Sequence, residues 1–174
     1  RKAHQRIRVG YVSSDFRDHP VAMLLVGVLE CHDRREFEVI TLSTRAEDQS
    51  ELAARIRRAA DRHIDVSSAS DPETSQLMRE LELDIAVDLT GFTDGGRISV
   101  FADRPSPVQV NFLGYPGTLG ADFYDYIIAD RIVIPPEHRN FYSESVAYLP
   151  ETFFPTDAAT GTVGKTTSRT EQGL

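Results

Sequence analysis

The sequence predicts an α/β fold in which a parallel sheet is covered by helices on both faces. Apolar, β-branched runs alternate with helix-sized segments almost from the start of the chain, and several runs end in polar or glycine-rich loops. Strands separated by helix-sized segments pair in parallel through βαβ units. Ligands of such sheets bind beyond the carboxyl ends of the strands, so the loops there are the first candidates for function.

The first half of the chain alternates predicted strands and helices. Arg6–Val12 (RIRVGYV) is β-branched and apolar, as a strand is, whereas Val21–Glu30 is apolar over most of its surface and favours a buried helix, although its valines also allow a strand. Asp48–Ala60 is amphipathic and predicts a second helix. A third helix begins with Asp71 as N-cap and Pro72 in its first turn. The remaining strands of this half are Phe37–Ser43 and His63–Ser67. The arginines of the second helix and its end, expected to form a solvated face, are Arg55, Arg57, Arg58 and Arg62.

Prolines and glycines delimit the elements of the second half. Asp84–Thr90 and Val108–Leu113 are predicted strands, and a short helix ends between them at Asp103, before a proline pair. Two further short strands flank a proline-rich connection, Tyr126–Ala129 and Val146–Leu149. Residues 1–155 therefore form one predicted domain. Residues 156–174 are small, polar and unpatterned, which indicates a linker or frayed tail.

Composition narrows the classes of function. Lys and Arg number 19 against 27 Asp and Glu, a net charge of −8, so the chain has no general electrostatic reason to bind nucleic acid or anionic lipid. Cys31 is the single cysteine, which fits a reducing compartment, and we expect it to be buried as a small hydrophobe. No apolar run approaches the roughly 20 residues that span a bilayer. P-loop, CxxC and HExxH patterns are absent, so neither a nucleotide cradle of the P-loop type nor a metal site is expected.

Three loops follow predicted strands at the same edge. Ser13–Pro20 (SSDFRDHP, the HP turn) carries two carboxylates, an imidazole and two hydroxyls where a helix begins, and His19 near Asp15 could serve as acid or base. The alternative is a turn capped by its serines and Asp15, with a solvated histidine. Leu113–Gly120 (LGYPGTLG, the YPG turn) could offer backbone N–H groups to a sugar hydroxyl or a phosphate. Gly91–Gly96 could likewise approach a ligand, and either glycine-rich loop could simply be a tight turn.

Three stretches carry a resemblance to a known family. They are RVGYVSSDFRDHPVAMLL (Arg8–Leu25), DLTGFTDGGRISVFADRPSPVQVNFLGYPGTLGADFYDYIIAD (Asp88–Asp130) and SVAYLPETFFPTD (Ser145–Asp157). In this order they resemble the catalytic region of protein O-GlcNAc transferases, which include bacterial tetratricopeptide-repeat glycosyltransferases and plant Spindly-type relatives. The resemblance implies a Rossmann-like parallel sheet with helices on both faces, the amino-terminal lobe of a GT-B glycosyltransferase whose active site lies between two lobes.

The resemblance also implies an activity. We expect half of an inverting glycosyltransferase that transfers GlcNAc from UDP-GlcNAc to Ser or Thr of acceptor proteins, located in the cytoplasm and needing no metal cofactor. The partners it implies are a missing carboxy-terminal lobe and upstream tetratricopeptide repeats, so the chain alone should be inactive. Two alternatives remain: another donor, GDP-fucose or UDP-glucose, or a non-catalytic module that binds nucleotide sugars.

The resemblance assigns roles residue by residue. Asp15 and His19 match the family's Asp and His, which face the donor sugar and the acceptor hydroxyl, and either could orient the acceptor or relay its proton. Asp18 and Val21 depart from the animal members, which have Asn and Thr there. The expected substrate-binding residues are Pro20, Leu113, Gly114, Tyr115 and Pro116, with the backbone of Leu113 and Gly114 on the GlcNAc hydroxyls. These roles require the HP and YPG turns to share one rim of the sheet.

Overall fold

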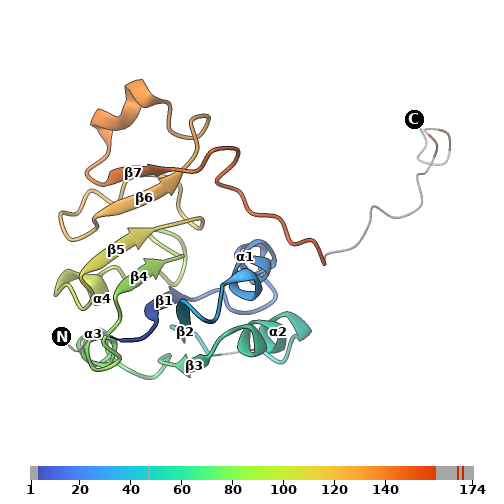
Figure 1. Cartoon of the computed structure of the whole chain (residues 1–174), viewed down its shortest axis with the longest axis vertical. Coiled ribbons are helices and arrows are strands. Elements are labelled where there is room, and N and C mark those ends of the chain that lie inside the picture. Colours follow the sequence, from blue (N-terminus) through green and yellow to red (C-terminus); the bar gives the residue numbers. More distant parts are fainter. Residues whose placement is uncertain (1–3, 47, 160–167, 169, 171–174) are drawn as a thin grey trace.

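The computed structural model describes residues 4–46, 48–159, 168 and 170. They form a seven-stranded sheet in the order β3-β2-β1-β4-β5-β6-β7, in which every neighbouring pair is parallel (Figure 1). The strands are β1 (Ile7–Ser13), β2 (Phe37–Ser43), β3 (Arg62–Asp65), β4 (Ile85–Asp88), β5 (Val108–Asn111), β6 (Tyr126–Ala129) and β7 (Ser145–Tyr148). The predicted parallel α/β sheet is therefore confirmed, and all carboxyl ends of its strands point to one edge.

Helices lie on both faces of the sheet, as predicted. In Figure 1, α1 (Pro20–Cys31) and α2 (Glu51–Ala59) lie together on one side, and α3 (Asp71–Glu80) and α4 (Ser99–Ala102) on the other. Each pair packs on its own apolar cluster. A short 3₁₀ helix, η1 (Pro136–Phe141), connects β6 to β7. On the α1 side, β1 and the strands β4 to β7 line an apolar cavity of about 400 Å³ that no helix of the described chain fills.

The buried face of α1 explains why its valine-rich sequence is a helix. Its fully buried residues are Ala22, Leu25, Val26 and Leu29. Their spacing of three and four residues places them on one side of a helix, which a strand with its period of two would split between two faces. Each such buried leucine stabilises the fold by about 1.5–3 kcal/mol.

Two local predictions are wrong. The N-cap of α3 is Ser70 rather than Asp71, because Ser70 and Glu73 form a capping box in which each side chain accepts from the other's backbone N–H. Asp71 is instead the first helical residue and accepts from Arg97 Nε at 2.5 Å. Cys31 is exposed rather than buried, because it is the last residue of α1 and lies off the buried face.

A segment that follows β7, Leu149–Ala159 (the strap), returns across the sheet to α1. Asp130 accepts from the backbone N–H of Phe153 at 2.9 Å, and Phe153 packs on the α1-side core. Asp157 then accepts from Arg55, whose guanidinium also bridges Glu30 with Nε and Nη2 at 2.7 and 2.6 Å. Arg55 is therefore not a purely solvated member of its arginine face. Of the predicted linker, 156–174, only 156–159, 168 and 170 are described, so the domain boundary stays a prediction.

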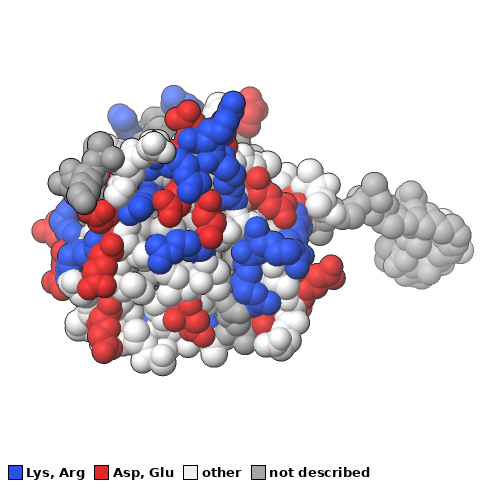
Figure 2. Space-filling view, turned by 60° about the horizontal axis from the view of Figure 1, so that its bottom comes forward, with Lys and Arg blue, Asp and Glu red and all other residues white. Residues whose placement is uncertain are grey.

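The surface around β3 mixes charges of both signs. Figure 2 shows Lys and Arg interspersed with Asp and Glu on this face, without a broad area of one sign. Within the described parts of the chain, no helix is both long enough and apolar enough to cross a bilayer.

Candidate functional site

Three loops form one continuous rim at the carboxyl edge of the sheet, because β1, β4 and β5 are neighbours. The HP turn contacts the Gly91–Gly96 loop: the Ser14 hydroxyl donates to the Asp94 carbonyl at 3.1 Å. That loop contacts the YPG turn, where the rings of Phe92 and Tyr115 meet edge-on with centroids 5.5 Å apart. The structure thus brings the two predicted turns to one edge, joined through the loop between them.

Asp15 lies in the HP turn with its side chain 5% exposed. Its backbone N–H donates to the Ser13 hydroxyl at 3.0 Å, which shapes the turn. One carboxylate oxygen lies 3.4 Å from Arg17 Nη2 and 3.7 Å from His19 Nε2. A nearly buried carboxylate is thus flanked by two side chains that can carry positive charge, which offsets part of its desolvation.

His19 is the N-cap of α1. Its Nδ1 accepts from the Val21 backbone N–H at 3.2 Å, and Pro20 occupies the first helical position. Because Nδ1 is the acceptor, a neutral imidazole carries its proton on Nε2, the nitrogen that faces Asp15. The alternative of a solvated histidine is wrong, because His19 caps α1. The serine cap of the turn is confirmed for Ser13, whose hydroxyl accepts from the Asp15 N–H. In this geometry His19 offers an N–H donor at the rim.

The YPG turn begins with a strained residue. Leu113 has a φ of 72° and a buried side chain, so a bulky residue occupies the left-handed region, at a cost of about 1–2 kcal/mol. A Cβ on Gly114 would lie 1.9 Å from the Leu89 carbonyl oxygen, so only glycine fits there. Tyr115 is half-buried and Pro116 exposed. With the Leu113 side chain in the core, the backbone is what this part of the turn can offer a ligand, and the sugar contact itself stays a prediction.

Sequence reasoning missed the polar residues beneath the rim. Asp88, at the end of β4, accepts from the N–H groups of Thr90 and Gly91 and from the Tyr124 hydroxyl at 2.6 Å. Burial raises the pKa of the Asp88 carboxyl, and these hydrogen bonds oppose the rise. An Asp three residues before a glycine-rich loop is a local signal of an Asx turn and could have been noticed. The other missed residues, Asn111 and Glu144, hold the YPG turn.

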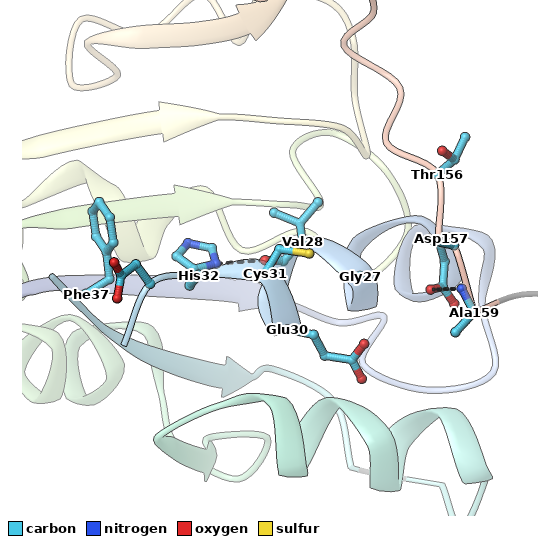
Figure 3. A pocket seen from close by; sticks show the side chains of 11 residues that line it. Gly27, Val28, Glu30, Cys31, His32, Phe37, Thr156, Asp157 and Ala159 are labelled. Carbon is cyan, nitrogen blue, oxygen red and sulfur yellow. Dashed lines mark hydrogen bonds between the residues drawn. The ribbon is translucent and has the colours of Figure 1, made fainter. Parts of the chain in front are cut away.

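A cavity of about 580 Å³ lies away from the rim, between the end of α1 and the strap (Figure 3). Glu30 and Cys31 from α1 and Thr156 and Asp157 from the strap line it, and His32 Nδ1 pairs with the Val28 carbonyl at 2.8 Å. None of the predicted site residues lines this cavity. Within residues that the structure describes, no group of three or more His, Cys, Asp or Glu gathers as metal ligands would.

The comparisons with known proteins agree on one family. The sequence model of glycosyl transferase family 41 matches residues 1–163. The chain is 37% identical over 153 residues to an Arabidopsis thaliana protein named "Probable UDP-N-acetylglucosamine–peptide N-acetylglucosaminyltransferase SEC", covering 88% of this chain and 16% of that protein. A Caenorhabditis elegans UDP-N-acetylglucosamine–peptide N-acetylglucosaminyltransferase is 36% identical over 156 residues, which cover 89% of this chain and 14% of that protein. The solved structure of a K341M mutant of Thermobaculum terrenum O-GlcNAc transferase superposes with a TM-score of 0.84 at 38% identity, covering 87% of this chain and 29% of that one. The chain thus spans about one sixth or less of these curated relatives.

Proposed function

The chain belongs to glycosyl transferase family 41, and from that membership we propose that it is the amino-terminal lobe of an inverting enzyme that transfers GlcNAc from UDP-GlcNAc to Ser or Thr of proteins. The observation that carries the proposal is the contiguous rim formed by the HP turn, the Gly91–Gly96 loop and the YPG turn. The site lies in a cleft between this rim and a second lobe of the full polypeptide. Since one lobe supplies half of a cleft, the rim of this chain alone is open surface.

The two turns of the rim have different roles in the transfer: the HP turn acts on the acceptor and the YPG turn binds the sugar. The acceptor oxygen attacks the anomeric carbon, and the bond between that carbon and the diphosphate oxygen breaks with inversion. UDP leaves, and the proton of the acceptor hydroxyl passes to the Asp15 carboxylate. His19, capped through Nδ1, presents Nε2–H as a donor that orients an acceptor or donor oxygen. The Asp15 carboxylate lies 3.7 Å from Nε2, too far for a hydrogen bond, so that N–H stays free for the substrate and a carboxylate lies near the departing proton. The backbone of Leu113 and Gly114 receives the GlcNAc hydroxyls, and Pro20, Tyr115 and Pro116 complete the wall.

The proposal extends to the rest of the polypeptide and its setting. We propose that transfer needs no metal cofactor, that tetratricopeptide repeats and a carboxy-terminal lobe belong to the same polypeptide, and that the enzyme works in the cytoplasm. Coverage of only 16% of the Arabidopsis relative supports the further segments. A single cysteine supports a reducing compartment.

UDP-GlcNAc is favoured over another donor by the names of the relatives. The Arabidopsis SEC protein, the Caenorhabditis elegans transferase and the rice SPINDLY protein, 37%, 36% and 30% identical to this chain, are all named for UDP-N-acetylglucosamine. The test offers UDP-GlcNAc, UDP-glucose and GDP-fucose separately to the full-length polypeptide with an acceptor protein. Transfer from UDP-GlcNAc is expected, and transfer from GDP-fucose alone would refute the donor assignment.

The site assignment is tested by His19→Ala and Asp15→Ala in the full-length polypeptide. Both variants should lose transfer by about 100-fold or more, the range of a positioned acid–base or orienting group, while keeping the thermal unfolding midpoint of a folded protein. Two exposed residues away from the rim serve as matched controls. Asp103→Ala, at the opposite edge of the sheet, matches Asp15→Ala, and His138→Ala, on η1, matches His19→Ala; both controls should transfer normally. Normal turnover in His19→Ala and Asp15→Ala would remove the HP turn from the mechanism.

The non-catalytic alternative has its own test. A binding module would bind UDP-GlcNAc without transferring the sugar even in the full-length polypeptide. The 174-residue chain alone is expected to show no transfer in either case, because it supplies half of the cleft. Transfer by the purified chain would contradict the proposal that both lobes are needed.

A further inference from the structure

The far end of the YPG turn is held by one buried carboxylate. Glu144, between η1 and β7, is 3% exposed. Its Oε1 accepts from the Leu119 backbone N–H at 2.7 Å, and its Oε2 accepts from the Thr118 hydroxyl at 2.7 Å. The Thr118 hydroxyl in turn accepts from the N–H groups of Gly120 and Ser143 at 3.1 and 3.3 Å. One side chain therefore organises three consecutive residues of the turn.

The near end of the turn is fixed by the sheet itself. Gly114 donates to the Phe112 carbonyl at 2.9 Å and packs against the Leu89 carbonyl. Asn111, at the end of β5, donates from Nδ2 to the Gly117 carbonyl at 3.0 Å. The stretch between these anchors holds Tyr115 and Pro116. The geometry of the predicted sugar wall thus depends on a strand at one end and on Glu144 at the other.

Burying a carboxylate to hold a turn costs the free energy of its lost hydration. Among the described residues, Glu144 has no Arg, Lys or His partner, so hydrogen bonds from the turn and from Ser143 are what offset the loss of hydration. Hydrogen bonds to a charged acceptor are shorter and stronger than neutral ones, and an amide acceptor would not reproduce them. The YPG turn is consequently held more rigidly than its glycines would otherwise allow.

We propose that Glu144 is a positioning residue for the donor sugar: through Thr118 and Leu119 it fixes the far end of the YPG turn, so that Tyr115 and Pro116, between the two anchors, form the wall that meets the GlcNAc ring. Glu144 touches no substrate itself. The inference rests on the proposed function, since it names what sets the sugar-binding half of that site. In the proposed function this rim receives the sugar, and we expect the second lobe to hold the nucleotide, so the defect should be confined to ligands that carry the sugar.

The test measures binding of UDP-GlcNAc and of UDP to the full-length polypeptide with Glu144→Gln. The glutamine amide would face the Thr118 hydroxyl, whose acceptor positions are already taken, so the turn loses its clamp. The Kd for UDP-GlcNAc should rise by about tenfold, while the Kd for UDP changes less than about twofold. Glu137→Gln, an exposed glutamate on η1, is the matched control and should change neither.

A second variant keeps the proposal falsifiable if Glu144→Gln does not fold. Thr118→Val removes the hydroxyl and should give the same selective loss, and the double variant should bind no more weakly than the worse single one, because both act through one contact. Equal loss of UDP and UDP-GlcNAc binding would show a merely structural role and overturn the inference, as would unchanged binding in a folded variant. Failure of the wild-type polypeptide to bind UDP-GlcNAc would overturn the proposed function, and the inference with it.

Discussion

Replacing Gly114 by alanine tests the packing of the rim most directly. The added Cβ would lie 1.9 Å from the Leu89 carbonyl oxygen and 2.9 Å from the carbonyl carbon. An ordinary carbon–oxygen contact is about 3.3 Å, so the turn or the end of β4 must move by about 1.4 Å. Both obstacles are backbone, which cannot rotate away as a side chain can. We therefore expect a destabilisation of about 3 kcal/mol, at the upper end of the usual cost of overpacking.

Gly120→Ala is the matched control in the same turn. Gly120 has a φ of 65°, and a Cβ there would meet nothing within 4 Å. Its substitution costs the backbone conformation alone, about 1 kcal/mol. Urea unfolding of the 174-residue chain should separate the two variants by about 1 M in midpoint, for a slope near 2 kcal/mol per M. A Gly114→Ala variant no less stable than Gly120→Ala would refute the packing of the YPG turn against β4.

Two further predictions concern the strap. Backbone N–H groups, first that of Val133 and then that of Phe153, hold the pKa of Asp130 below its ordinary value, so its stabilising contribution is present above the unfolded pKa of about 3.9 and is lost as the pH falls through the folded value. The stability difference between wild type and Asp130→Asn should accordingly shrink between pH 6 and pH 3 in urea titrations, and a difference independent of pH would contradict it. Arg55→Lys cannot bridge Glu30 and Asp157 with paired hydrogen bonds, and should lower stability by about 1 kcal/mol in thermal unfolding, whereas the exposed Arg35→Lys should have little effect.

The elements that could be predicted were those whose signal is local. The period of apolar residues in α1, and the bounds of β2 and β6, follow from residues a few positions apart, so the order of strands and α-helices could be predicted. The 3₁₀ helix η1 could not, since its residues were expected to be a proline-rich connection. The predictions were wrong where neighbouring side chains could each cap the same helix. Ser70 rather than Asp71 caps α3, and His19 itself caps α1, because the cap depends on which side chain reaches the free N–H groups.

The candidate site divides in the same way. That the HP and YPG turns lie at one edge could be predicted, because parallel strands direct every carboxyl end to the same side. The residues that hold the rim could not. Glu144 lies 25 residues beyond Leu119 in the sequence, and Asp157 lies 102 residues beyond Arg55. Nothing in their immediate surroundings marks them as partners.

The amino-acid sequence by itself thus predicts an α/β lobe with two polar turns at the carboxyl edge, and it identifies the family of the protein. Tertiary structure alone decides how those turns are held: which carboxylate clamps the YPG turn, which nitrogen of His19 faces the rim, and how the strap is fastened to α2. The physical reason is the distance along the sequence over which each feature is encoded. Strands and helices are encoded in periodic burial over a few residues, whereas a hydrogen bond between distant segments exists only after the sheet has brought them together.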